Sequence, residues 1–171
     1  MNDKRLIPLV IALTVIPLIG LGCNPGKTAV ESAIESQTGG KVNINEQGGT
    51  INFQGQKGET ITVGSEESGS VAIPADFPTD MPVYAGAKVL AVYQSKAEGT
   101  ANLSLTTSDA ADKVTTWYED QFKSWKQETT MDLGAGRVRV YSKDSVRIQL
   151  TISSDQETNK TTVMVTRVTE K

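Results

Sequence analysis

The sequence contains no histidine and only one cysteine, Cys23, among its 171 residues. Without histidine the chain lacks the commonest general base and a frequent metal ligand. A single cysteine allows no intrachain disulfide, so a hydrophobic core has to stabilise the fold. Zinc would have to be bound by carboxylates alone. No glycine-rich phosphate-binding loop precedes a segment with helical periodicity. The chain contains the residue types needed for catalysis by Ser/Lys or by paired carboxylates, but their spacing in the sequence does not favour either mechanism. We therefore expect no catalytic residues, no metal and no cofactor.

Positive charge is also scarce. The formal net charge is −3, and it becomes −4 when residues 1–22, which carry Lys4, Arg5 and Asp3, are left out. Proteins that bind phosphate backbones present basic patches. The composition therefore argues against a nucleic-acid partner.

A hydrophobic run of membrane-spanning length is missing as well. Lys4 and Arg5 precede the uncharged residues 6–22, a run shorter than the ~20 apolar residues of a transmembrane helix. It contains two prolines, and no basic cluster follows it. A short basic region, an apolar run and a small residue at its end are typical of a secretory signal. We therefore predict that residues 1–22 are a signal peptide.

Cys23 follows this segment directly. Residues 19–23, IGLGC, resemble the lipobox of bacterial lipoproteins, with Gly22 as the small residue and Gly20 where leucine is common. The resemblance implies a diacylglycerol on the Cys23 sulfur and an acyl chain such as palmitate on its amino group. Two or three chains anchor stably, because each buried CH₂ adds about 0.8 kcal/mol. Residues 23–27 would be the lipidated tether. The alternative is a conventional cleavage with an incidental cysteine.

The next segment, residues 28–64, is predicted to form a short helix and a three-stranded β-meander. Thr28 and Glu31 have the spacing of a capping box. Apolar and polar residues alternate within residues 41–63, which indicates half-buried strands. Residues 65–72 contain three Ser, two Glu and one Gly and are predicted to be a linker.

Residues 73–171 are predicted to form an α+β domain. Three prolines spaced by four residues make residues 73–87 an extended strap rather than a helix. A long amphipathic helix is predicted over residues 108–125, with a core-facing stripe of Val114, Trp117, Tyr118, Phe122 and Trp125. With two strands before it and four after it, the order is β-β-α-β-β-β-β. The predicted fold is an antiparallel sheet crossed by one long helix.

The sequence PTDMPVYAGA (residues 78–87), followed by a strand pair and a V-x-x-W-Y helix, resembles small uncharacterised bacterial lipoproteins. Those proteins carry a proline-rich P-x-D-x-P-x-Y-x-G-A strap before an α+β domain, often with proline where this chain has Ala85. The resemblance extends to residues 38–44 and covers most of the mature chain. It implies an architecture and an envelope location, but no activity. Asn24, rather than Asp, after the cysteine implies the outer membrane of a two-membrane cell, and otherwise the outer face of the plasma membrane.

Three features are candidates for binding. The first is a possible ligand or partner surface of aromatic side chains, whose helical spacing also suits a packed core: Phe77, Tyr84, Trp117 and Tyr118. The second is the strap, as a partner edge or as a structural element. The third is a calcium site or a solvated acidic face made by Glu66, Glu67, Asp76 and Asp80, although no liganding loop supports calcium.

Together these features predict a membrane-anchored cell-envelope lipoprotein that is not an enzyme and that binds a protein partner or a small apolar ligand. One alternative is an envelope-polymer hydrolase that uses Asp or Glu. That chemistry requires two carboxylates facing each other across about 5–10 Å. The other alternative is a passive structural lipoprotein.

Overall fold

The structure is a computed structural model that describes residues 26–45, 49–65, 67 and 69–170, with the side chains of the first helix described from Glu31 onward. The predicted signal peptide 1–22 and the lipidation site Cys23 lie outside the described residues, as does Glu66. In the part of the chain that is described, no helix combines the length and the apolar character needed to cross a bilayer.

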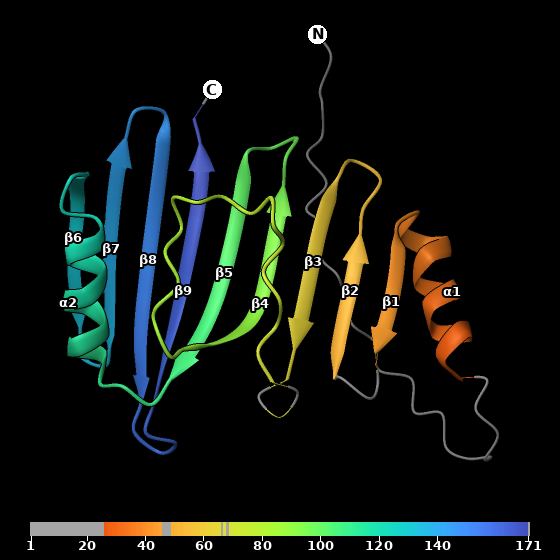
Figure 1. The fold of residues 1–171 in the computed structure, drawn as a ribbon, viewed down its shortest axis with the longest axis horizontal. Helices are drawn as coiled ribbons and strands as arrows, with labels where there is room; N and C mark the ends of the chain where they lie inside the picture. The colour runs from red at the N-terminus through yellow and green to blue at the C-terminus, as the bar shows by residue number, and fades with distance from the viewer. Residues whose placement is uncertain (1–25, 46–48, 66, 68, 171) are drawn as a thin grey trace, which may run out of the picture.

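Nine strands and two helices make up the described part of the chain, and the strands lie side by side in one sheet (Figure 1). In chain order they are α1 (Gly26–Thr38), β1 (Lys41–Asn45), β2 (Thr50–Gln54), β3 (Glu59–Gly64), β4 (Lys88–Ser95), β5 (Thr100–Thr107), α2 (Ala111–Gln121), β6 (Lys126–Leu133), β7 (Gly136–Lys143), β8 (Val146–Asp155) and β9 (Lys160–Thr169).

The sheet is antiparallel throughout, in the order β1-β2-β3-β4-β5-β9-β8-β7-β6. Strands β1 to β5 follow one another across the sheet. Helix α2 then carries the chain to the far edge, from which β6 to β9 return to the centre (Figure 1). Two meanders therefore meet at the β5–β9 pair.

The predicted fold class is wrong in two respects. First, the three-stranded meander is not a separate unit, because β3 pairs with β4 and places Ile61 opposite Tyr93. It forms one end of a nine-stranded sheet. Second, the protein has no long helix among its described residues, since α2 contains only residues 111–121 of the predicted 108–125.

Local hydrogen bonds explain why α2 is short. Ala110 occupies the N-cap position, and no side chain caps the helix there. At the other end, the Trp125 backbone N–H donates to the Phe122 carbonyl at 2.8 Å, a tight turn that a continuing α-helix would not contain. The periodicity of the aromatic stripe continues through this turn, so the sequence pattern alone overestimates the length of the helix.

Helix α2 and the strap (residues 73–87) lie on the same face of the sheet, which we call the covered face (Figure 1). Strand register aligns its buried side chains in rows: Leu103 pairs with Val92 and with Val165, and Val165 pairs with Leu150. Burying such a side chain contributes roughly 1.5–3 kcal/mol. The fully buried residues of this core are Leu103, Leu105, Val114, Tyr118, Ile148, Leu150, Ile152, Val163 and Val165.

The strap is held to this face by polar contacts as well as by its buried apolar side chains. Arg167 Nε donates to both carboxylate oxygens of Asp80 at 2.9 Å, and Gln94 Nε2 donates to the Asp76 carbonyl at 3.3 Å. Charge-assisted bonds of this kind are stronger than neutral ones. The strap therefore closes the core over β4, β5 and β9.

The opposite side of the sheet, which we call the open face, has no described helix or strap over it. The first three strands turn their apolar side chains to this face. Paired residues share a face, so Ile61 points the same way as Tyr93 and away from buried Val92. Ile51 and Val63 are 49% and 42% exposed. The apolar residues of β1 to β3 on the open face are Val42, Ile44, Ile51, Phe53, Ile61 and Val63.

Helix α1 lies along the outer edge of β1 (Figure 1). The Val42 N–H donates to Glu35 Oε1 at 2.9 Å, and the Ile44 N–H donates to Glu31 Oε1 at 2.6 Å. Residues four apart on a helix are separated by ~6 Å, and alternate strand residues by ~6.6 Å, so the two spacings match. The helix therefore satisfies amides that an edge strand would otherwise leave open to another chain.

Candidate functional site

The aromatic residues predicted as a possible binding surface pack against one another between the strap and α2. The Tyr84 ring lies edge-to-face with Trp117, with centroids 5.2 Å apart, and Trp117 lies edge-to-face with Tyr118 at 4.8 Å. Phe77, Tyr84 and Tyr118 are buried, and Trp117 is partly buried. These side chains join the strap to the core and leave no open aromatic groove between them.

The hydroxyls of this cluster also have partners. Tyr84 Oη donates to Asp109 Oδ2 at 2.6 Å, and Tyr118 Oη donates to the Pro82 carbonyl at 3.2 Å. The hydrogen bond to Asp109 raises the pKa of Tyr84, and burial raises the pKa of Tyr118. Both hydroxyls therefore remain protonated donors that fix the strap to the start and the middle of α2.

The acidic residues considered for calcium are separated by ion pairs. Asp76 pairs with Lys96, and Asp80 with Arg167. Across the described residues there is no group of three or more His, Cys, Asp or Glu side chains that could hold a metal ion. The geometry favours a solvated acidic surface over a cation site.

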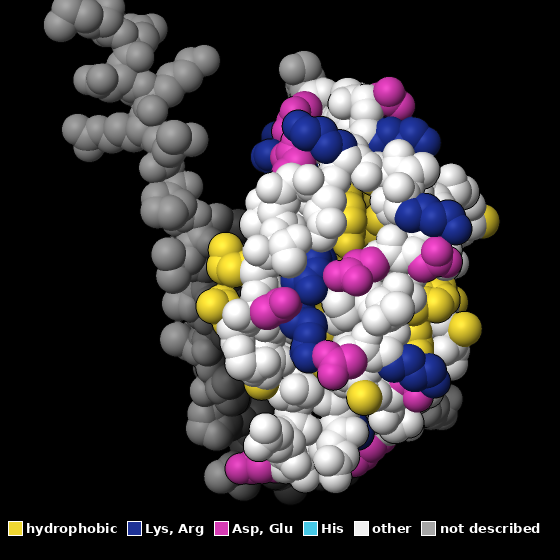
Figure 2. All heavy atoms as spheres, turned by 90° about the vertical axis from the view of Figure 1, so that its left-hand side faces the viewer, with side chains coloured by type: hydrophobic (Ala, Val, Ile, Leu, Met, Phe, Trp, Pro, Cys, Tyr) yellow, Lys and Arg dark blue, Asp and Glu magenta, His cyan; other side chains and the backbone are white. Residues whose placement is uncertain are grey.

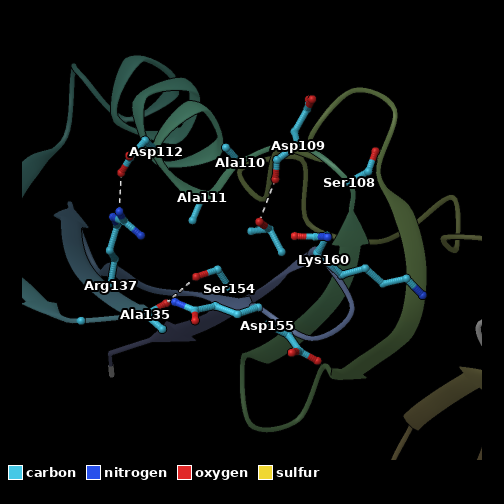
Figure 3. Close-up of a pocket in the computed structure, with 14 residues that line it drawn as sticks. Ser108, Asp109, Ala110, Ala111, Asp112, Ala135, Arg137, Ser154, Asp155 and Lys160 are labelled. Carbon is cyan, nitrogen blue, oxygen red and sulfur yellow. Dashed lines mark hydrogen bonds and ion pairs between the residues drawn. The ribbon is translucent and has the colours of Figure 1, made fainter.

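The start of α2 borders a hollow of about 410 Å³ between the β6–β7 and β8–β9 turns (Figure 3). Figure 3 shows Asp112 pointing to Arg137, with Asp155 at the opposite side of the hollow. The Thr161 hydroxyl donates to the Asp109 carbonyl at 2.7 Å and ties β9 to the turn before the helix. Three carboxylates, those of Asp109, Asp112 and Asp155, line this hollow.

Each carboxylate of this hollow is engaged by its own partner. Asp109 accepts from Tyr84 and pairs with Lys113, and the Tyr84 hydrogen bond lowers its pKa. Asp112 pairs with Arg137, and Asp155 accepts from the Thr158 hydroxyl at 2.8 Å, which lowers the pKa of Asp155. General acid catalysis needs a carboxyl with a raised pKa. The arrangement does not favour the carboxylate pair of a glycosidase.

Charged side chains of both signs alternate on the side of the molecule formed by α2 and β6 (Figure 2). Arg139, which is only 5% exposed, donates to Glu119 at 2.8 Å and to Asp132 at 2.7 Å. The hydrogen bond from Arg147 holds the pKa of Glu128 at about 2. The Arg139 pairs connect β7 to α2 and to β6, and the Arg147–Glu128 pair connects β8 to β6.

A second hollow, of about 510 Å³, lies on the covered face of the first three strands, beside Pro74 of the strap. Amide and hydroxyl side chains line much of it, because these strands turn their polar residues this way. The Thr62 hydroxyl donates to Asn52 Oδ1 at 2.9 Å, so part of this polar surface is satisfied internally.

Trp125 stands between two further hollows of about 340 Å³ each, at the end of α2. The hollow toward β6 is lined by Glu119, Phe122, Lys123, Trp125, Gln127, Thr130 and Tyr141. The hollow toward the strap is lined by Thr79, Asp80, Pro82, Gln121, Phe122, Trp125 and Lys143. We call these two hollows together the Trp125 groove. Their sizes fall at the lower end of the ~300–1,000 Å³ typical of ligand pockets.

The Trp125 groove borders a buried polar atom that has no partner. Tyr141 is 2% exposed, and its hydroxyl makes no hydrogen bond in the described structure. Burial raises the pKa of this tyrosine, so the group stays a neutral hydroxyl. An unsatisfied buried hydroxyl costs about 1–3 kcal/mol. The other two buried tyrosines, Tyr84 and Tyr118, have partners, which sets Tyr141 apart.

Sequence reasoning identified neither the open-face residues nor the Trp125 groove as candidate sites. Trp125 was assigned to the core-facing stripe, although it is only partly buried. Trp125 lies outside the helix because the chain turns at Phe122, and no pattern in the sequence predicts this turn. The strands that contain Ile51 and Val63 show the same apolar–polar alternation as the buried strands. The sequence pattern therefore could not indicate that these two side chains are exposed.

No protein-family model, curated protein or solved structure matches this chain.

Proposed function

We propose that the protein is a bacterial cell-envelope lipoprotein, held to a membrane by lipid on Cys23, that binds a partner protein through the open face of its sheet and catalyses no reaction. The proposed membrane is the outer membrane in a two-membrane cell and otherwise the plasma membrane. The anchor rests on the sequence of residues 19–23, which precede the described part of the chain. The binding role rests on the structure.

One observation supports the binding role above the others. Strands β1 to β3 place their apolar residues on the face opposite the core, where Ile51 is 49% and Val63 42% exposed. Ile51 and Val63 pair directly, and Ile44 and Ala91 continue the row on either side. Contiguous exposed apolar surface with a polar margin is typical of interaction sites. On the same face, β5 and β9 add the polar residues Asn102, Ser104, Thr162 and Thr166, with Met164, 50% exposed, between the two threonines.

The same surface favours a protein over a small apolar ligand or a lipid surface. The space between α2 and the sheet is filled by fully buried side chains such as Leu103 and Val114, which leaves no room there for an apolar ligand. Among the described residues that β1 to β4 turn to the open face, the only Lys or Arg is Lys88, which pairs with Thr106 at the start of β4. Membrane-binding surfaces usually add basic residues to their apolar ones. A flat apolar patch with a single lysine beside it suits another protein.

Site-specific photo-crosslinking in intact cells tests the partner. A benzophenone amino acid at position 51 is expected to give a discrete adduct of higher mass. Gln149, which lies on the open face of β8 between Val140 and Thr166 and far from β2 in the sheet, is the matched control position and is expected to give none. Val63→Arg should abolish the adduct at position 51, because it places an uncompensated charge within the patch. Absence of any adduct at position 51 would favour the passive structural alternative.

The anchor has a separate test. Cys23→Ala should move the protein from the membrane fraction to the soluble fraction and should prevent labelling with palmitate. A Cys23→Ala variant that stays in the membrane fraction would contradict lipid anchoring, and it would leave the open-face binding role untouched.

A further inference from the structure

We propose that the partner bound by the open face is a second copy of this chain, packed sheet against sheet about a two-fold axis that runs across strands β1 to β4. This identity rests on the function proposed above, because it names the occupant of the same surface. Three features of the surface support it: the register of its apolar residues, the two charges that flank them, and the area that they cover.

The register of β1 to β4 sets their apolar open-face residues in two adjacent rows. The first row consists of Ile44, Ile51, Val63 and Ala91, and the second of Val42, Phe53, Ile61 and Tyr93. Val42 is buried, and the other seven side chains keep part of their surface exposed. Neither row contains a charged residue. Two copies can therefore lie on one another without bringing like charges together within the rows.

One charged residue flanks the rows at each end. Lys88 lies at the start of β4, beyond the row that contains Ala91. Glu59 lies at the start of β3, beyond the row that contains Ile61, and it pairs with Ser95 near the end of β4. Ser95 is seven residues from Lys88, a separation of about 24 Å along a strand. The two charges are therefore too far apart to meet within one copy.

Neither charge is neutralised by its own chain. The Glu59 carboxylate accepts a hydrogen bond from the Lys57 backbone N–H at 3.0 Å. Within the part of the chain that the structure describes, neither Glu59 nor Lys88 has an ion-pair partner. Each flank of the apolar rows thus presents one charge, and the two flanks are of opposite sign.

A two-fold axis across the strands brings these opposite charges together. It lays the Lys88 end of one copy over the Glu59 end of the other, and symmetry forms this contact twice. Each apolar row then lies over the other row of the second copy, so that Ile51 of one faces Phe53 of the other. An axis parallel to the strands would instead place both lysines at one margin and both glutamates at the opposite margin, which like-charge repulsion disfavours.

The area of the surface suits a dimer of modest affinity. Four strands about 4.8 Å apart and four residue rows about 6.8 Å apart, the charged margins included, cover roughly 19 by 27 Å. This is about 500 Å² per copy, and the sum of about 1,000 Å² for two copies is at the lower limit for a specific interface. Stacked sheets lie ~10 Å apart, and their twist carries β8 away from the contact.

Photo-crosslinking at position 51 identifies the occupant. The full-length protein with the benzophenone amino acid is co-expressed with an unmodified copy that carries a longer C-terminal tag. We expect a two-copy adduct whose mass increases with the tag and whose cross-link lies within residues 50–64 of the second copy. An adduct that does not shift with the tag would overturn the second copy as the occupant and leave the proposed partner binding standing. No adduct at all would contradict both.

Charge reversal tests the two-fold arrangement. Lys88→Glu and Glu59→Lys should each lower the yield of the two-copy adduct about threefold or more, because each sets like charges together. Combining the two in one chain should restore at least about half of the original yield. Since the two positions are far apart in one copy, only a contact between copies explains such a recovery. The hydrogen bond from Lys57 is lost in the combined variant as well, so it cannot cause the recovery.

Matched controls keep the two charge changes but move them elsewhere. Lys143→Glu and Glu157→Lys alter exposed residues outside the open face of β1 to β4 and should leave the adduct yield unchanged. The thermal unfolding temperature of each variant is measured alongside. A combined Lys88→Glu and Glu59→Lys variant that unfolds at the same temperature as the single variants, and whose adduct yield stays as low as theirs, would overturn the proposed dimer.

Discussion

The two ends of the sheet use the same alternation of apolar and polar residues to opposite effect. In β5, Leu103 and Leu105 point into the covered face and are fully buried. In β2 and β3, the equivalent apolar positions point to the open face, where Ile51 and Val63 remain about half exposed. The alternation of apolar and polar residues determines which residues of a strand share a face. The comparison teaches that this alternation does not determine which face of the sheet the strap and α2 cover.

The face is decided at the join between β3 and β4. The pairing of Ile61 with Tyr93 places the apolar residues of β3 opposite to buried Val92. A shift of this pairing by one residue would turn the whole apolar set toward the strap and α2, because side chains alternate strictly along a strand. The strap itself lies between these two strands in the chain, and its buried residues Phe77, Met81 and Tyr84 provide cover for β4 and β5 but not for β1 to β3.

The largest contrast between the two ends is expected from truncating one apolar residue in each. Leu150→Ala should lower the free energy of unfolding by about 2–5 kcal/mol, because it leaves a cavity in a fully buried core. Ile51→Ala should lower it by less than about 1 kcal/mol, since the side chain is half exposed. Urea unfolding followed by circular dichroism measures both. Equal losses would mean that the open face of β2 is covered by further structure.

A smaller effect is expected from the clamp that holds the strap over the core. Asp80→Ala removes both hydrogen bonds from Arg167 Nε and leaves that partly buried guanidinium, 17% exposed, without its carboxylate. A loss of about 1.5–3 kcal/mol is expected, as for hydrogen bonds to charged groups. Limited proteolysis should then cut within residues 73–87 first. Protection of the strap in this variant would show that its aromatic contacts suffice.

The edge beside α1 should respond more weakly. Glu31→Ala and Glu35→Ala each remove the acceptor of one β1 amide, which should cost about 0.5–1.5 kcal/mol and should speed hydrogen exchange at Ile44 and Val42 respectively. Glu→Gln at the same positions keeps an acceptor oxygen and serves as the control. If the Gln variants exchanged as fast as the Ala variants, the carboxylate charge, and not the hydrogen bond, would be the stabilising element.

Acid sensitivity should come from the end of the sheet that carries the ion pairs. The hydrogen bond from Arg147 lowers the pKa of Glu128 from its ordinary value of 4.5 to about 2. A carboxylate with a lowered pKa adds stability that is fully present above its unfolded value and is lost as the pH falls through its folded value. Stability should therefore decline gradually between pH ~4.5 and ~2. In Arg147→Met, whose Glu128 lacks this partner, the decline over that window should be shallower by chemical denaturation at each pH.

Local signals in the sequence located much of the secondary structure but not its arrangement. Alternating segments such as residues 146–153 do form strands, and residues 111–121 of the predicted helix are helical. Glu31 was interpreted as part of a capping box, whereas its carboxylate accepts from Ile44, thirteen residues later in the chain. That partner becomes available only when β1 lies alongside α1. The Trp125 groove likewise depends on a turn, a strap and two strands that are distant in sequence.

By itself the sequence determined the apolar–polar periodicity of each segment, the absence of histidine and of an intrachain disulfide, and the candidate anchor at Cys23, because these depend on residue identity and on spacing along the chain. Only the tertiary structure decided that one sheet of nine strands replaces two units, that no described element covers the apolar face of β1 to β3, and that the Tyr141 hydroxyl has no partner among the described residues. These outcomes follow from strand register and from which elements cover a face. Both are set by competition among long-range contacts that no local pattern encodes.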